Sequence, residues 1–483
     1  MSELGHVERL SSGQGVARVR SLLDKIWDTH VVASGSGPVW IAIDRIFLHE
    51  RTGAIALEGL QQRGRTVQGA ARVFCTIDHI VDTLPGRTDE TLMPGGREFI
   101  TRTRAAAQAA GIRLFDVSDR DQGIVHVISP ELGLALPGLT IVCPDSHTCT
   151  QGAVGAFAWG IGSTEAEHAL ATGTLRLRKP PTLRVSFDGR LGDWVGAKDL
   201  SLRLLSRRGA AGGRGKAVEF AGSAVRALDM EARFTLCNMA TEFSAVTGMI
   251  SPDDTTFNYL QGRDFAPRGA DWDRALANWR SLASDETAFF DEQITIDVDD
   301  LAPMITWGTS PQHAAAVSGT VPAVEDSGTT REAYARALQY MDLQPGQALK
   351  SVAIDAAFIG SCTNGRISDL RSAARVLAGR KIAPGVRALC VPGSSRVKRQ
   401  AEAEGLDDIF RSAGFEWRES GCSLCFYAGG ENLGFGKRVV SSTNRNFEGR
   451  QGPGTRTHIA SPATVAASAI RGVIADVRCL QAA

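Results

Sequence analysis

Strand-like and helix-like segments alternate along the first part of the chain. Short β-rich runs at 39–43, 72–76 and 139–143 are separated by segments with helical spacing, such as 97–110. This alternation favours an α/β fold built on a largely parallel sheet. A chain of 483 residues is too long to form one hydrophobic core, so we expect two to four domains.

Polar side chains follow three of the apolar runs directly. They are Asp78 with His79, then His126, then Asp145 with His147. A single histidine after a strand is more often a loop residue, and an aspartate there is often a helix cap. Ligands of open α/β sheets, however, bind beyond the carboxyl ends of the strands. Three such groups within about seventy residues therefore indicate a functional site.

Three cysteines in the last third of the chain suggest a metal centre. Cys422 and Cys425 form a Cys-x-x-Cys motif, and Cys362 lies about sixty residues upstream. The motif alone fits a redox pair, half of a zinc site or two buried thiols. Three thiolates suit an iron–sulfur cluster in which one iron lacks a protein ligand, and such an iron is a Lewis acid. A structural zinc site explains neither the odd number of cysteines nor the accompanying acid–base groups.

Two further groups add candidate polar residues. The segment 230–248 reads as a helix, on which Asn238 and Glu242 are four residues apart and share one face. A polar helix edge explains that spacing equally well. Arg445 and Arg450 bracket a turn with glycine near the cysteines. Guanidinium groups hold carboxylates by bidentate hydrogen bonds, so this turn is a candidate carboxylate site rather than a solvated surface.

Composition excludes several functional classes. Lysine plus arginine and aspartate plus glutamate both number 53, so there is no overall charge to attract nucleic acid or membrane. No apolar run approaches the ~20 residues of a membrane helix, and the first residues lack the apolar stretch of a signal peptide. Nine cysteines are too sparse for a disulfide scaffold, so we expect a cytoplasmic protein with reduced thiols.

We divide the chain into five segments from these signals. They are a mobile extension at 1–20, a first α/β domain at 21–183, a second at 184–305, a linker at 306–348, and a cluster-binding α/β domain at 349–483.

The motifs together resemble a known family. The matching stretches include 76–79, 122–126, 145–148, 236–240, 359–364 and 442–452, and the likeness extends over roughly residues 21 to 478. On these residues the chain resembles the large subunits of the isopropylmalate isomerases (3-isopropylmalate dehydratases), in the aconitase superfamily. The resemblance implies a hydro-lyase that interconverts 2-isopropylmalate and 3-isopropylmalate by dehydration and rehydration, in leucine biosynthesis.

The resemblance also implies a fold, a cofactor and site residues. The fold is an aconitase-like assembly of three α/β domains around one 4Fe-4S cluster, lacking the swivelling fourth domain. The implied cluster ligands are Cys362, Cys422 and Cys425. The implied catalytic residues are Asp78, His79, His126, Asp145, His147 and Glu242. The implied substrate-binding residues are Asn238, Asn444, Arg445 and Arg450, and Asn364 would lie near the cluster.

A partner is implied as well. In this family the swivelling domain is a separate small subunit, which brings a serine base and further contacts to the hydroxy-dicarboxylate substrate. We therefore expect a heterodimer, no activity from this chain alone, and neither nucleic acid nor membrane as partner.

Some positions depart from the family pattern and keep other substrates open. Residues 51–57 replace a usual Val-Thr-Ser-Pro-Gln-Ala-Phe, Pro144 replaces a glycine, Gln151 replaces a histidine, and Gly365 stands where serine is common. A hydro-lyase for another cis-unsaturated diacid, maleate or citraconate, is the alternative. A cluster-based RNA-binding or iron-sensing protein is a third reading, disfavoured by the neutral charge and the lack of a basic run.

Overall fold

Three parallel sheets organise the chain. The structure is a computed structural model that describes residues 19–34, 37–427 and 430–480. Almost all of the extension predicted for residues 1–20 therefore lies outside the described residues. Every strand pair within the three large sheets is parallel, so the predicted α/β fold is confirmed. No helix in the described ranges is both long and apolar enough to cross a membrane.

The first large sheet has the strand order β5-β4-β3-β6-β7. Its strands are β3 (Arg45–His49), β4 (Val73–Thr76), β5 (Arg113–Phe115), β6 (Thr140–Cys143) and β7 (Phe157–Gly160). The helices of this part are α1 (Leu22–His30), α2 (Gly53–Gln62), α3 (Gly96–Ala109), α4 (Val125–Glu131) and α5 (Ser163–Thr172). A small antiparallel sheet of β1 (Val31–Ala33), β2 (Val39–Ala42) and β8 (Thr174–Leu177) lies beside it.

The second large sheet has the order β11-β10-β9-β12. It consists of β9 (Thr182–Asp188), β10 (Ala217–Ala221), β11 (Thr247–Met249) and β12 (Glu292–Asp297). Its helices are α6 (Ala197–Arg208), α7 (Ser223–Ala227), α8 (Met230–Asn238), α9 (Asp254–Leu260) and α10 (Ala270–Leu282). The chain then forms the hairpin of β13 (Met304–Thr306) and β14 (Ala314–Ala316), followed by α11 (Arg331–Met341).

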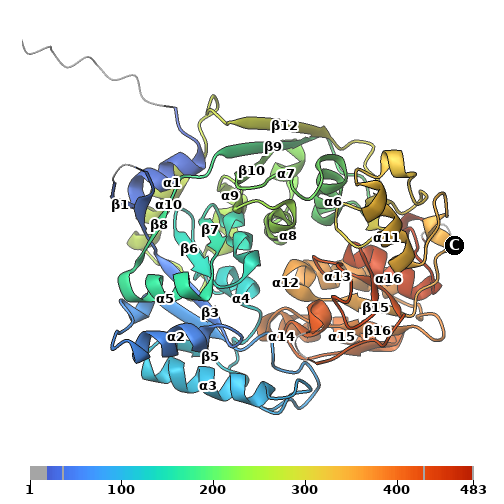
Figure 1. Ribbon diagram of the computed structural model, residues 1–483, viewed down its shortest axis with the longest axis horizontal. Helices are drawn as coiled ribbons and strands as arrows, with labels where there is room; N and C mark the ends of the chain where they lie inside the picture. The colour runs from blue at the N-terminus through green and yellow to red at the C-terminus, as the bar shows by residue number, and fades with distance from the viewer. Residues whose placement is uncertain (1–18, 35–36, 428–429, 481–483) are drawn as a thin grey trace, which may run out of the picture.

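The third large sheet has the order β17-β16-β15-β18-β19. It consists of β15 (Ala356–Ile359), β16 (Arg387–Cys390), β17 (Phe415–Trp417), β18 (Arg438–Ser441) and β19 (Arg456–Ile459). Its helices are α12 (Ser361–Asn364), α13 (Ile367–Leu377), α14 (Ser395–Ala403), α15 (Leu406–Ala413) and α16 (Pro462–Arg471). In Figure 1 the blue and cyan elements of the first sheet lie at lower left, the green second sheet along the top, and the orange and red third sheet at the right.

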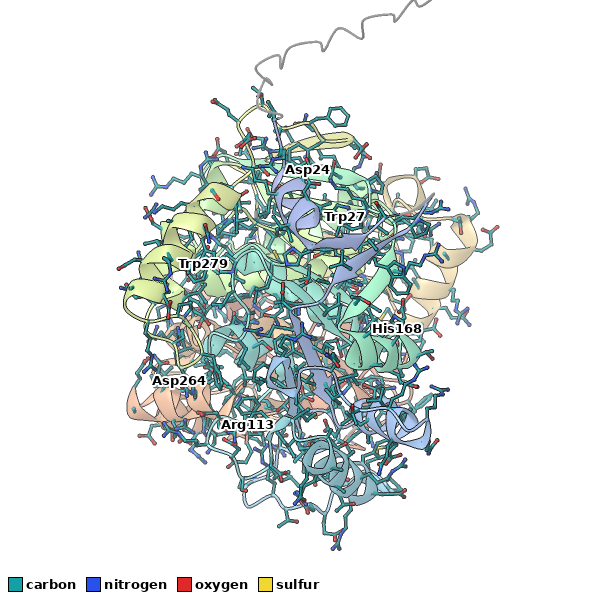
Figure 2. All side chains as sticks on the ribbon, turned by 90° about the vertical axis from the view of Figure 1, so that its left-hand side faces the viewer. Asp24, Trp27, Arg113, His168, Asp264 and Trp279 are labelled. Carbon is teal, nitrogen blue, oxygen red and sulfur yellow. The ribbon has the colours of Figure 1, made fainter. Side chains whose placement is uncertain are left out.

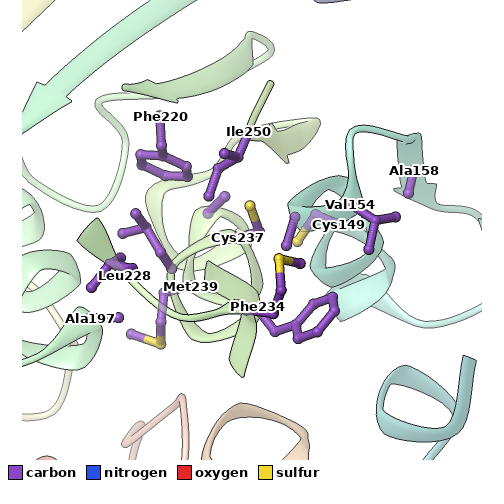
Figure 3. Close-up of a cluster of buried hydrophobic side chains, with 14 of the residues drawn as sticks. Cys149, Val154, Ala158, Ala197, Phe220, Leu228, Phe234, Cys237, Met239 and Ile250 are labelled. Carbon is purple, nitrogen blue, oxygen red and sulfur yellow. The ribbon is translucent and has the colours of Figure 1, made fainter. Parts of the chain in front are cut away.

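The first two sheets share one hydrophobic core. A single cluster of buried side chains runs from Phe47 on β3 through α8 to Leu301. Figure 3 shows Cys237 of α8 with Phe220 and Ile250 on one side and Cys149 and Val154 on the other. Helix α8 thereby holds the segment after β6 in place against the second sheet. The five-part division of the chain stays a prediction.

Helix α1 ties the start of the described chain to the second sheet's last helix. Ser21 and Asp24 form a capping box at its N-terminus. The Lys25 ammonium donates to the carbonyl of Ser281, at the end of α10, over 3.0 Å. Figure 2 shows Asp24 and Trp27 of α1 and Trp279 of α10 on the same side of the molecule.

Two local predictions are wrong. His126 does not follow a strand: it lies in the first turn of α4, because the side chain of Asp78 accepts the Val125 N–H over 2.8 Å at the start of this helix. The helix predicted at 230–248 ends at Asn238 and continues as a 3-10 turn to Phe243. Ser244 then adopts φ +63°, a left-handed conformation that ends the helical run. Asn238 and Glu242 therefore do not share the face of one α-helix.

Candidate active site

Most of the predicted polar residues line one pocket between the first and third sheets, and the others contact residues that line it: Asp78, Asn238, Glu242 and Asn444. Asp78 and His79 follow β4, Asp145 and His147 follow β6, and Arg445 follows β18. The cavity holds about 180 Å³ and is lined by His79, His126, Asp145, His147, Cys362, Cys422, Cys425, Arg445 and Arg450, with further neighbours. A larger cavity of about 520 Å³ elsewhere contains none of the predicted catalytic residues.

Asp145 is the centre of the polar network. One of its carboxylate oxygens lies 3.0 Å from Nε2 of His126 and accepts the backbone N–H of His147 over 2.7 Å. Its other oxygen lies 3.3 Å from Nε2 of His79. Burial alone raises the pKa of a carboxyl, but hydrogen bonds from the three histidines outweigh it and hold the pKa of Asp145 well below 3.8. Asp145 is thus a fixed anion that orients several rings, and it also caps the 3-10 segment 146–154.

His79 lies between two carboxylates. Its Nδ1 is 2.6 Å from Oδ1 of Asp78, and its Nε2 faces Asp145. Burial lowers the pKa of an imidazole, but the charges of Asp78 and Asp145 overcome that effect and raise the pKa of His79 well above 6.5. Burial likewise raises the pKa of Asp78, and its pairing with His79 overcomes this and lowers it below 3.8. The two carboxylates therefore favour the imidazolium form of His79.

Glu50 and His49 hold Asp78 and His79 in position. Glu50 is 1% exposed, and its carboxylate accepts the backbone N–H groups of Asp78, His79 and Ile80 over 3.0, 2.6 and 2.5 Å. The ring of His49 stacks on that of His79 at 4.2 Å between centroids. Burial, and then the charge of His79, lower the pKa of His49 to about 4, so this ring is neutral.

His147 connects the network to the arginine turn. Its Nε2 lies 3.1 Å from Oε1 of Glu242, and the same oxygen forms an ion pair with Nε of Arg445 at 2.7 Å. Glu242 is buried beside both partners, with 8% of its side chain exposed. A continuous series of ion pairs and hydrogen bonds therefore runs from Asp78 through His79, Asp145 and His147 to Arg445.

The three predicted thiols lie at the other side of the same pocket. Cys362, Cys422 and Cys425 are 5%, 6% and 5% exposed and form one cluster with Ile124 and Val127. Cys362 follows β15 and Ser361, which adopts φ +83°, and Ser423 beside Cys422 adopts φ +46°. Left-handed conformations of non-glycine residues cost free energy and are enriched at functional sites.

Two asparagines are aimed at the Cys362 sulfur. The Nδ2 groups of Asn238 and Asn444 donate to Sγ over 3.2 and 3.4 Å. Asn238 also accepts from Thr363 over 2.9 Å, which fixes its orientation. Asn364 instead donates to Thr235 and Asp369 and lies behind the thiol. The first two asparagines thus contact a candidate metal ligand, and their substrate-binding role stays a prediction.

The structure brings the predicted site residues together. Two residues that hold them in position, His49 and Glu50, were not predicted as site residues. His49 and Glu50 come directly after β3, the same strand-end signal that singled out Asp78 and Asp145. Applying that signal to every strand of the first sheet finds both. Glu50 accepts only backbone amides in this network, and no residue pattern shows that contact.

The sequence matches a known family. The profile of the aconitase family (aconitate hydratase) matches residues 24–472. The chain belongs to the aconitase family.

Two curated relatives are similar to the chain over nearly its whole length. The 3-isopropylmalate dehydratase large subunit 1 of Bradyrhizobium diazoefficiens is 53% identical over 467 residues, which are 96% of this chain and 98% of the relative. The 3-isopropylmalate dehydratase large subunit of Roseiflexus castenholzii is 51% identical over 466 residues, 95% of this chain and 99% of the relative. The resemblance read from the motifs is confirmed.

Proposed function

We propose that this chain is the large subunit of a 3-isopropylmalate dehydratase. The enzyme removes water from 2-isopropylmalate and adds it back at the neighbouring carbon to give 3-isopropylmalate, a step of leucine biosynthesis in the cytoplasm. The observation that carries this proposal is the series of ion pairs and hydrogen bonds from Asp78 to Arg445 beside three buried thiols. Both relatives carry this name, which favours this activity over maleate or citraconate hydration and over RNA binding.

The thiols fit a 4Fe-4S cluster better than a single metal ion. Within the described ranges, one set of His, Cys, Asp and Glu side chains has all its ligand atoms within 4.8 Å of one another: His49, Glu50, Asp78 and His79. The three sulfurs are thus spread more widely than the ligands of one zinc ion, whose bonds are ~2.3 Å long. The amide donors on Cys362 match the hydrogen bonds that support metal-bound thiolates. We infer that Cys362, Cys422 and Cys425 hold one 4Fe-4S cluster.

The His49, Glu50, Asp78 and His79 set is not a second metal site. The carboxylate of Glu50 is already occupied by three backbone N–H groups, and Asp78 is occupied by His79 and Val125. These contacts leave the group as a support for His79.

The chain's residues supply proton transfer and charge. When bound, the cluster supplies an iron that acts as a Lewis acid toward the substrate hydroxyl. His79 holds a proton between Asp78 and Asp145 and can give it from Nε2 to the departing oxygen as a general acid. Arg445, held by Glu242, and Arg450 place guanidinium groups in the pocket, where they stabilise the negative charge that develops as the carbon beside a carboxylate loses its proton. By the resemblance, the base that removes this proton comes from the small subunit.

Reconstitution with a small subunit tests this function. The chain, loaded anaerobically with iron and sulfide, is assayed alone and with the small subunit of the same organism on 2-isopropylmalate, citraconate and maleate. We expect the two subunits together to turn over 2-isopropylmalate and this chain by itself not to. Turnover of maleate or citraconate in preference to isopropylmalate contradicts the proposed substrate, and full activity of the chain alone contradicts the proposed partner.

The pH profile of the assembled enzyme reports on His79. The groups that face this ring are Asp78, Asp145, Glu50 and the neutral His49. Because the pKa of His79 is raised, the imidazolium and its pairing energy are fully present below pH 6.5 and are lost as pH rises through the folded-state value. We expect kcat to hold from pH 6.5 upward and to fall only well above it. In an Asp78→Asn variant the alkaline fall moves toward lower pH, and an unmoved fall excludes this ring as the titrating group.

A further inference from the structure

Two guanidinium groups share one aromatic ring at the wall of the pocket. The Cζ atoms of Arg51 and Arg450 each lie 4.6 Å from the centroid of the Phe426 ring. The two charges are therefore no more than twice that distance apart. Phe426 directly follows Cys425, and all three residues line the cavity that holds the histidines and thiols. Stacking on an aromatic face holds a guanidinium plane in place without using its N–H donors.

These two arginines differ from Arg445 in their partners. Arg445 is neutralised by Glu242 at 2.7 Å. Arg450 is 7% exposed, its Nε is buried without a hydrogen-bond partner, and its Nη2 lies 3.8 Å from the Cys425 sulfur. For Arg51, the contact in the described part of the chain is the Phe426 ring and not a carboxylate. Arg51 lines the cavity as an exposed residue and Arg450 as a buried one, and cationic donors without a carboxylate partner favour an anionic ligand.

The position of Arg51 makes it part of the site and not of the outer surface alone. It comes two residues after His49, at the end of β3. Its neighbour Thr52 also lines the cavity, with its hydroxyl 3.3 Å from Nε2 of His49. Position 51 is also the first residue of the segment in which this chain departs from the usual family pattern. The family usually has valine at this position, and this chain has arginine. The arginine therefore adds a positive charge to this part of the pocket wall.

We propose that Arg51 binds a carboxylate of the diacid substrate. Arg450 supplies a second guanidinium group, and the Phe426 ring, which contacts both arginines, orients them; these three residues are called the clamp. A hydroxy-diacid carries two carboxylates at neutral pH, and the planar fork of an arginine matches a carboxylate through two parallel hydrogen bonds. This inference rests on the proposed function and identifies a specificity-determining residue of the same site.

Binding of a non-reacting diacid tests the clamp. Isopropylsuccinate lacks the hydroxyl and cannot lose water, and 4-methylpentanoate has one carboxylate fewer. Calorimetric titration of the cluster-loaded enzyme, assembled with its small subunit, is done with both compounds. Because hydrogen bonds to charged groups are among the strongest in proteins, Arg51→Gln is expected to weaken isopropylsuccinate binding about 10- to 100-fold. Arg51→Lys, which keeps the charge without the planar fork, recovers part of it.

The monoacid and a matched arginine serve as controls. If Arg51 holds the carboxylate that 4-methylpentanoate lacks, its affinity for this compound is unchanged in Arg51→Gln. Arg65→Gln removes an exposed arginine of the region that follows α2, outside the pocket, and is expected to leave both affinities at the parent values. In turnover, KM for 2-isopropylmalate rises in Arg51→Gln more than kcat falls.

Three results separate the possible failures. No loss of affinity for either compound overturns the clamp, whereas equal loss for both assigns Arg51 to the carboxylate that 4-methylpentanoate keeps. Weakened binding of the small subunit with unchanged diacid affinity in the assembled enzyme also overturns it, because Arg51 then belongs to the subunit interface. A parent enzyme that neither binds isopropylsuccinate nor converts isopropylmalate contradicts the proposed function instead.

Discussion

The Cys422→Ser variant is expected to lose the cluster and the activity together. Serine has no thiolate to offer, and two remaining cysteines leave a second iron without a protein ligand. Iron and sulfide content and visible absorbance, measured after anaerobic loading, should fall to the level of unloaded protein. The activity of the assembled enzyme should fall below detection, because the Lewis acid that assists the departing hydroxide is lost.

The backbone contact at Cys422 does not depend on the side chain, so this variant is expected to fold. Cys422 donates its N–H to the carbonyl of Asp78 over 2.9 Å, and serine keeps that bond. Far-UV circular dichroism should therefore match the parent. Cys479→Ser is the matched control, since Cys479 is an exposed cysteine far along the chain from the motif. Activity that persists in Cys422→Ser after the cluster is gone contradicts a role of the cluster in turnover.

The polar site residues that directly follow strands could be predicted from the sequence, because the carboxyl ends of parallel strands lie at one edge of the sheet. Asp78, His79, Asp145 and His147 could be predicted for that reason. The residues that hold them depend on tertiary contacts instead. Nothing in the sequence places the Glu50 carboxylate under three successive amides.

Helix ends were harder to predict than strand ends. The apolar spacing of residues 230–248 predicts one continuous helix. The helical run ends earlier because Ser244 takes a left-handed conformation, which a serine does not indicate in the sequence. His126 was expected after a strand, but the Asp78 carboxylate starts a helix there from a distant part of the chain. In both cases a contact or a backbone angle outweighed local propensity.

The cysteines illustrate a different limit. Their spacing indicated a metal centre but left zinc, redox and cluster chemistry open. The pocket adds two amide donors on one sulfur and acid–base residues facing the thiols. The two amides come from α8, 124 residues before Cys362, and from the turn after β18, 82 residues after it. The support of a metal site is therefore a property of the fold and not of the motif.

Replacing His79 by glutamine is expected to lower kcat by about 10²- to 10⁴-fold, the usual contribution of a general acid. Glutamine keeps a hydrogen-bond donor near Asp78 but has no proton to give at neutral pH. The cluster absorbance and the affinity for isopropylsuccinate should stay near the parent values, because no thiol and no guanidinium is altered. Stopped assays of the assembled enzyme at pH 7 measure the loss.

His30→Gln is the control that separates proton donation from the loss of any buried ion pair. His30 lies 2.7 Å from Asp44, and its pKa is raised in spite of burial because Asp44 accepts from it. It repeats the histidine–aspartate pairing of His79 outside the pocket. Its replacement removes stability but leaves kcat unchanged. A His79→Gln enzyme that keeps its cluster and stays within about threefold of the parent kcat transfers the proton from another group, and the ring of His147, held between Asp145 and Glu242, is then the residue to replace next.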